Sequence, residues 1–83
     1  MTPRQRQVLD AIEAFRDQYG LSPSIREIGQ AIGVTSPSTI HSHVQSLIRE
    51  GLLEEMLPEG HPGAANRNLR LTRAGMKARV ETL

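Results

Sequence analysis

The sequence predicts a mainly α-helical domain with a small antiparallel β-hairpin, and three observations support this fold class. Apolar residues recur at helical spacing in three successive segments, each of which begins at a capping residue. Residues 69–71 then alternate apolar and polar side chains as a strand does, and residues 52–57, whose alternation is imperfect, are expected to form another strand. A stretch rich in proline and glycine lies between the two segments. A short amphipathic segment follows residues 69–71. The chain is therefore expected to fold as three helices, a hairpin and a short C-terminal helix.

The first helix is expected over residues 3–19. Thr2 can cap it, Pro3 suits its first position and Gln5 completes a capping box. Gly20 can supply the left-handed residue that ends it. The stripe that should face the core consists of Val8, Leu9, Ala11, Ile12, Phe15 and Tyr19.

A second capping box, Ser24 with Glu27, starts the next helix, which should end at Gly33. Its buried face should consist of Ile25, Ile28 and Ile32.

The third helix should begin at the cap Ser36, with Pro37 in its first position, and run to about Glu50. Its core stripe is Ile40, Val44, Leu47 and Ile48. At 100° per residue, the opposite face carries Ser38, Ser42, Gln45, Ser46 and Arg49, with Thr39 near its edge. A helix selected only for solubility would more often carry Glu and Lys, which are better helix formers than Ser or Thr. This face therefore indicates a constraint other than solubility.

Gly51 should end the third helix, and residues 52–57 and 69–71 should pair as a hairpin around an irregular segment, residues 58–67. Thr72 can cap the last helix. Met76, Val80 and Leu83 share one face of this helix. Two interpretations of that face stay open, namely that it covers the first helix or that it contacts a second copy of the chain.

Composition excludes several classes of protein. The 83 residues allow one domain, residues 1–83, and the absence of cysteine excludes disulfides, thiolate zinc sites and cysteine nucleophiles. His41 and His43 lie two apart, point about 200° apart on a helix and cannot share a metal ion. The acids are scattered and no phosphate-binding loop occurs, so we expect neither an enzyme nor a cofactor, metal or small-molecule substrate. No apolar run is long enough for a membrane span or a signal peptide, which predicts a cytoplasmic protein.

Two helices joined by a tight turn at Gly33, the second with a capped N-terminus and a polar outer face, are typical of a helix-turn-helix. A hairpin after the third helix makes this the winged variant. The N-terminus of a helix offers N–H groups and a positive dipole to phosphate, and short side chains allow close approach to base edges. The net charge of +1 identifies no partner. A winged domain that binds another protein therefore stays open as the alternative to a DNA-binding domain.

Residues 23–29 (Pro-Ser-Ile-Arg-Glu-Ile-Gly) and 38–44 (Ser-Thr-Ile-His-Ser-His-Val) closely resemble the DNA-binding domain of LexA repressors, and the likeness extends over about residues 2–71. The resemblance implies a transcriptional repressor that reads a palindromic operator in double-stranded DNA. The oligomeric state stays open, with a homodimer on DNA as one alternative. Helix 36–50 would lie in the major groove and the wing, residues 57–68, on the backbone. By position, base contacts would fall to Ser36, Ser38, Thr39, His41 and Ser42. Backbone contacts would fall to Arg4, Arg26, Gln45, Arg49 and Arg67.

The sequence departs from the LexA pattern in three ways. LexA-like proteins carry a C-terminal peptidase domain, which the 83 residues ending at Leu83 do not include, so self-cleavage is not expected. Glu50 stands where the family is often basic, and Glu59 lies in a longer wing tip, which weakens the implied phosphate contacts. Residues 71–76 instead resemble the ending of other small winged-helix regulators, which often dimerise through their last helix.

The two histidines need separate interpretations. For His41, a partly buried position at the edge of the core stripe and a base contact both stay open, whereas His43 is expected to be structural.

Overall fold

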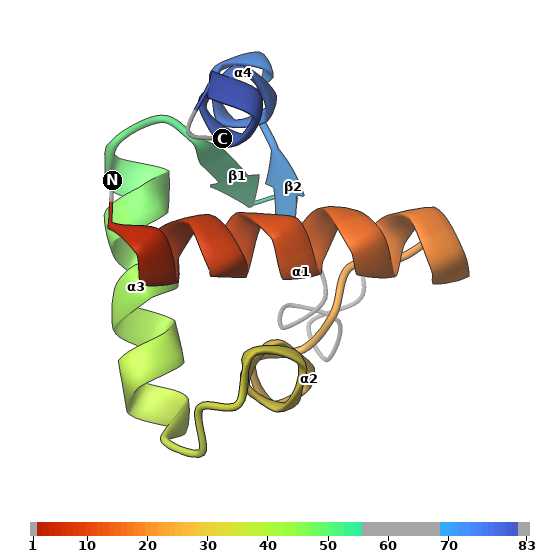
Figure 1. Cartoon of the computed structure of the whole chain (residues 1–83), viewed down its shortest axis with the longest axis vertical. Coiled ribbons are helices and arrows are strands. Elements are labelled where there is room, and N and C mark those ends of the chain that lie inside the picture. Colours follow the sequence, from red (N-terminus) through yellow and green to blue (C-terminus); the bar gives the residue numbers. More distant parts are fainter. Residues whose placement is uncertain (1, 56–68, 82–83) are drawn as a thin grey trace.

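In the computed structural model, which describes residues 2–55 and 69–81, three helices cross one another around a single hydrophobic core (Figure 1). These helices are α1 (Pro3–Tyr19), α2 (Ile25–Ile32) and α3 (Pro37–Arg49). Strands β1 (Leu53–Glu55) and β2 (Leu69–Leu71) and a last helix, α4 (Arg73–Glu81), follow. The expected class, mainly α with a small antiparallel hairpin, is confirmed.

The helix starts are set by the caps that the sequence contains. The Thr2 hydroxyl accepts a hydrogen bond from the Gln5 N–H at 3.2 Å, and the Gln5 side chain accepts one from the Thr2 N–H at 3.1 Å. Ser24 and Glu27 make the same reciprocal pair at 3.2 and 2.8 Å. These bonds satisfy amide groups that a helix leaves unpaired in its first turn, so both capping boxes are confirmed.

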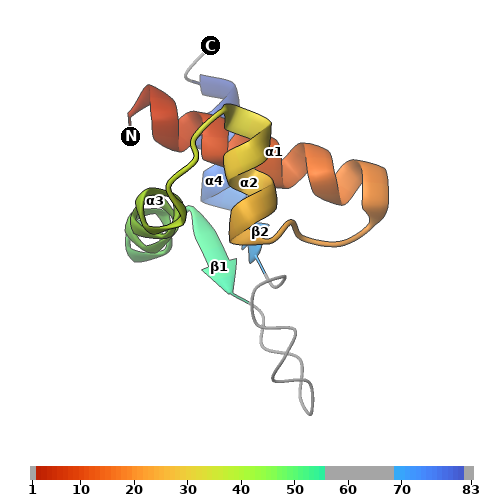
Figure 2. The same ribbon diagram turned by 90° about the horizontal axis from the view of Figure 1, so that it is seen from below.

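The hairpin continues directly from α3 (Figure 2). Its strands are antiparallel, with Leu53 opposite Leu71 and Glu55 opposite Leu69. The first strand was expected from residue 52, but the N–H of Leu52 bonds the carbonyl of Leu47 at 2.9 Å and so completes the exit from α3. Residues 56 and 57 of that expected strand, and the irregular segment 58–67, lie outside the described residues.

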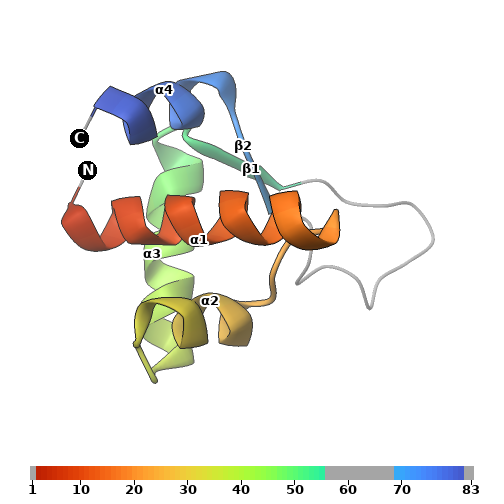
Figure 3. The same cartoon turned by 45° about the vertical axis from the view of Figure 1, so that its right-hand side comes forward.

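Helix α4 lies on the opposite side of α1 from α2 (Figure 3). As expected, the Thr72 hydroxyl accepts a hydrogen bond from the Gly75 N–H, at 3.0 Å. The interpretation that the apolar face of α4 covers α1 is wrong for Met76 and Val80, which are 46% and 61% exposed. Leu83, the third residue of that face, lies outside the described residues. Gly75 is buried instead, because α4 packs so closely on the residue before β1 that a Cβ at Gly75 would lie 2.0 Å from the Leu52 carbonyl oxygen.

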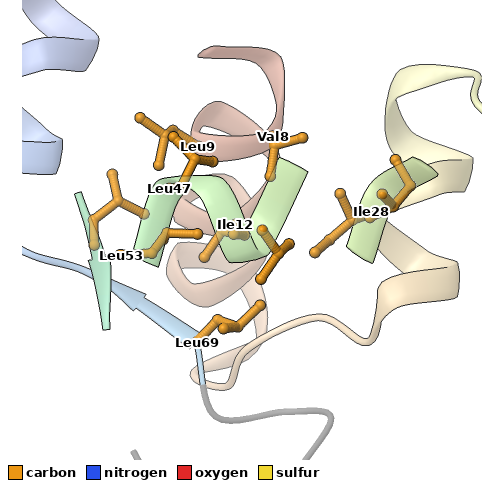
Figure 4. Packing of buried hydrophobic residues seen from close by; sticks show 10 residues of the cluster. Val8, Leu9, Ile12, Ile28, Leu47, Leu53 and Leu69 are labelled. Atoms are coloured by element: carbon orange, nitrogen blue, oxygen red, sulfur yellow. The ribbon is translucent and has the colours of Figure 1, made fainter. Parts of the chain in front are cut away.

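The core joins all three N-terminal helices to the inner face of the hairpin (Figure 4). Its buried side chains are Val8, Leu9, Ile12, Ile28, Ile40, Val44, Leu47, Leu53, Leu69 and Leu71. Tyr19, expected on the core stripe, is 57% exposed. Its ring centroid lies 4.5 Å from the ring centroid of Phe15. The stripe of α1 is therefore longer than the core that it covers.

Candidate nucleic-acid interface

Helices α2 and α3 are joined by a tight turn, residues 33–36 (Figure 2). Gly33 adopts the left-handed conformation, with φ of 76°, and the Val34 N–H bonds the Gly29 carbonyl at 2.9 Å. Gly29 is buried, and a Cβ there would lie 2.6 Å from the Val34 carbonyl oxygen. Two glycines with different roles therefore bring α3 close against α2: one turns the chain and the other leaves room for it.

Helix α3 has two sides with separate roles. Ile40, Val44 and Leu47 are buried in the core. Of the residues predicted on the outer face, Ser38, Thr39, Ser42 and Arg49 are exposed, whereas Gln45 and Ser46 are partly buried. The cap Ser36 and His41 are also exposed. No acidic residue occurs between residues 28 and 49. The outer side of α3 therefore presents short hydroxyl side chains without a carboxylate that would repel phosphate.

The start of α3 is open to solvent from residue 35 to residue 39. The Ser36 hydroxyl accepts a hydrogen bond from the Thr39 N–H at 3.4 Å and lies 3.2 Å from the Ser38 hydroxyl. Ser36 is thus the expected cap. The positive end of the helix dipole and the hydroxyls of Ser36 and Ser38 lie at the same exposed place, which favours a nearby anion.

Two predicted backbone-contacting arginines lie beside the helix-turn-helix. Arg26 is exposed on α2 and lines a groove of about 540 Å³ together with Thr35 and Pro37 at the start of α3. Arg4 is exposed at the start of α1, and its guanidinium donates to the Ile32 carbonyl at 3.2 Å, next to the turn. Arg67 and the wing, residues 57–68, lie outside the described residues.

The histidines lie on different sides of α3. His41 is exposed, so the interpretation that places it partly in the core is wrong, whereas His43 is partly buried. Among the residues that the structure describes, no group of three His, Asp or Glu side chains could hold a metal ion.

Sequence reasoning missed Ser22, which lies in the linker between α1 and α2. It is fully buried, and its hydroxyl accepts a hydrogen bond from the Leu69 N–H of β2 at 3.1 Å. Nothing in the local sequence signals this contact, because the two residues are 47 positions apart.

The helix-turn-helix and the hairpin that follows it define a winged helix-turn-helix protein. The chain belongs to the LexA DNA-binding domain family, whose model matches residues 1–64. A LexA repressor of Syntrophomonas wolfei is 48% identical over 50 residues, which are 60% of this chain and 24% of that protein. One of Exiguobacterium sibiricum is 45% identical over 53 residues, or 64% of this chain and 26% of that protein. The chain thus spans about a quarter of the length of these relatives.

Solved structures support the same fold. A mutant form of S. aureus MepR matches 99% of this chain and 55% of its own with a TM-score of 0.75 at 21% identity, which shows the fold alone. The PcaV transcriptional regulator of Streptomyces coelicolor matches 96% of this chain and 51% of its own, with a TM-score of 0.72 at 31% identity. No helix in residues 2–55 or 69–81 has the length and apolar character that crossing a membrane requires.

Proposed function

We propose that this protein is a sequence-specific transcriptional repressor that binds double-stranded DNA by placing α3 in the major groove. The observation that carries the proposal is the outer side of α3, which is exposed, rich in hydroxyls and free of carboxylates. The groove is wide enough for one helix, and short side chains let the helix backbone come close to the base edges. The close packing of α2 on α3 supports the helix that would be inserted.

Base contacts are assigned to the exposed side chains near the start of α3. Ser and Thr hydroxyls both donate and accept hydrogen bonds, so they can pair with several base edges, and an imidazole can do the same. The assigned residues are Ser36, Ser38, Thr39, His41 and Ser42.

Contacts to the DNA backbone are assigned to residues that border α3. Arg26 lies beside its start and Arg49 at its end, while Arg4 lies near the turn through its bond to the Ile32 carbonyl. Gln45 and Arg67 complete the assignment by family position, and the wing at residues 57–68 would follow the flanking backbone. Such contacts orient the protein on the duplex but do not read its sequence.

We propose that residues 1–83 form one DNA-binding domain without enzymatic activity of its own. The operator is expected to be palindromic and bound by two copies, because a two-fold symmetric pair of domains matches two-fold symmetric DNA. We expect the protein to work in the cytoplasm, where the chromosome of a bacterium such as those of the relatives above is found.

The test is a pair of charge substitutions on α3, Thr39→Glu and Ser42→Glu, assayed by fluorescence anisotropy on duplexes selected from a random library. A carboxylate against the groove is expected to weaken binding by about 100-fold or more, because like charges placed together cost several kcal/mol. The melting temperature should change by no more than a few degrees, because both positions are exposed.

Gln18→Glu, at an exposed position of α1, is the matched control and should keep the affinity of the unaltered protein. Undiminished binding by both α3 variants would refute the proposed interface. If the folded protein selects no duplex at all, the alternative of a protein-interaction module replaces this one.

A further inference from the structure

The only fully buried polar side chain among the described residues, Ser22, has no part in the proposed interface. Its hydroxyl donates to the Pro23 carbonyl at 3.2 Å and accepts from the Leu69 N–H at 3.1 Å. Buried polar groups are costly unless they are hydrogen-bonded, so this hydroxyl ties the linker between α1 and α2 to the hairpin.

The carbonyl of the same residue, Leu69, is bound from α1. The Arg16 guanidinium, in the last turn of α1, donates to it at 3.4 Å. Two side chains from outside the hairpin therefore bind both backbone polar groups of one β2 residue.

The strand register explains why Leu69 is free to accept these partners. The Thr72 N–H bonds the Leu52 carbonyl at 3.1 Å, and this bond flanks the pair Leu53 and Leu71, as in a non-hydrogen-bonded pair of an antiparallel ladder. Bonded and non-bonded pairs alternate along such a ladder, so the pair Glu55 and Leu69, two steps on, is also of the non-bonded kind. The N–H and C=O of Leu69 thus lie on the outer edge of β2, where Ser22 and Arg16 bind them. Strand β2 itself lies beside α1 (Figure 3).

We propose that Ser22 and Arg16 are positioning residues for DNA binding, which act through Leu69 by fixing where the hairpin lies relative to α3. This inference rests on the proposed function. The apolar side chains of Leu69 and Leu71 already hold β2 against the core, but burial has no preferred direction, whereas hydrogen bonds do. The two side-chain bonds therefore set the rotation of β2 on the core. That rotation decides whether α3 and the hairpin meet one duplex at the same time.

The decisive variant is Ser22→Ala, compared with Ser24→Ala. Both remove one hydroxyl from the same linker, but the Ser24 hydroxyl caps α2, whereas that of Ser22 binds the hairpin. Affinity is measured over a range of salt concentrations on two duplexes. One carries the selected operator with flanking base pairs, and the other is trimmed to the base pairs that α3 would read.

Ser22→Ala should lose the preference for the flanked duplex while keeping the affinity of the unaltered protein for the trimmed one. Its log-log salt slope on the flanked duplex should become shallower by about one to two, because each lost phosphate contact removes about one. Ser24→Ala should keep both the flank preference and the slope. A Ser22→Ala protein with unchanged flank preference and slope would overturn the inference, since the bond would then be purely structural.

A second pair of variants covers the case in which Ser22→Ala does not fold. Arg16→Met removes the donor to the Leu69 carbonyl, and Arg16→Lys restores a donor on a side chain of similar length. The methionine variant should lose the flank preference and the lysine variant should recover part of it. Equal behaviour of the two would contradict the role of Arg16. If the unaltered protein binds neither duplex, the proposed function itself fails. If the unaltered protein binds and the variants bind in the same way, only the inference about Ser22 and Arg16 fails.

Discussion

Gly75 determines how closely α4 approaches the rest of the molecule. A Cβ at this position would lie 2.0 Å from the carbonyl oxygen of Leu52 and 3.0 Å from its carbon. Both are backbone atoms, and the same carbonyl accepts the Thr72 N–H, so they cannot move aside as a flexible side chain could. Glycine is therefore required here by a close approach of two backbones.

The overpacking forced by Gly75→Ala is expected to cost up to about 3 kcal/mol, because the atoms that it meets are backbone atoms. Alanine returns about 1 kcal/mol of helix propensity, so the free energy of unfolding should fall by about 2 kcal/mol. Thermal unfolding followed by circular dichroism measures the difference. Ala74→Ser, at the exposed neighbouring position, is the control and should cost about 0.5 kcal/mol. A Gly75→Ala protein as stable as the original would contradict the close packing.

At the scale of elements, the sequence predicts best what is decided locally. The starts of α1, α2 and α3 follow from caps that lie within three residues of the groups they bind. The exposed side of α3 was also predictable, because the positions of Ser38, Thr39 and Ser42 follow from the helical repeat alone. These features need no knowledge of the rest of the chain.

Features decided by distant contacts were not predictable in the same way. The face of α4 was misjudged at Met76 and Val80, because its orientation is set by the packing of Gly75 on Leu52 and by an ion pair between Arg79 and Asp10 of α1. Ser22 was missed for the same reason, since its partner in β2 is far along the chain. Periodicity identifies an apolar face but not what lies opposite it.

The different anchoring of the helices predicts a difference in their local stability. In α4, Gly75 is the one buried residue among positions 73–80, and the Arg79–Asp10 pair is half-exposed, so it contributes at most about 1 kcal/mol. By contrast, α1 contributes three buried apolar side chains to the core. Amide hydrogen exchange should therefore be at least about tenfold faster in α4 than in the middle of α1, because α4 can open without exposing the core.

The variant Asp10→Asn removes the carboxylate that pairs with Arg79, so it should speed amide exchange in α4 and leave exchange in α3 unchanged. Equal protection of all four helices would argue against this difference in local stability.

At the scale of the whole molecule, the low net charge of +1 limits the long-range attraction of DNA. On the proposed function, binding would then depend on local contacts between arginines and phosphates. If about three to five phosphates are neutralised by each protomer, log K should fall with log salt concentration with a slope of about −3 to −5 per protomer. Anisotropy titrations from low to moderate salt would measure it, with Arg26→Gln and Arg49→Gln each expected to make the slope shallower by about one. A slope near zero would be incompatible with the proposed mode of binding.

The separation of α3 into a buried and an exposed side has a consequence for evolution and for design. Ile40, Val44 and Leu47 hold the helix in place, while Ser38, Thr39 and Ser42 contribute no side chain to the core. Replacing the second set therefore leaves the fold almost unaffected, because exposed substitutions usually change stability by less than about 0.5 kcal/mol. If α3 reads DNA as proposed, a new operator preference would require few mutations and little compensation elsewhere. The domain is thus a suitable scaffold for libraries in which those three positions are randomised to recognise chosen DNA sequences.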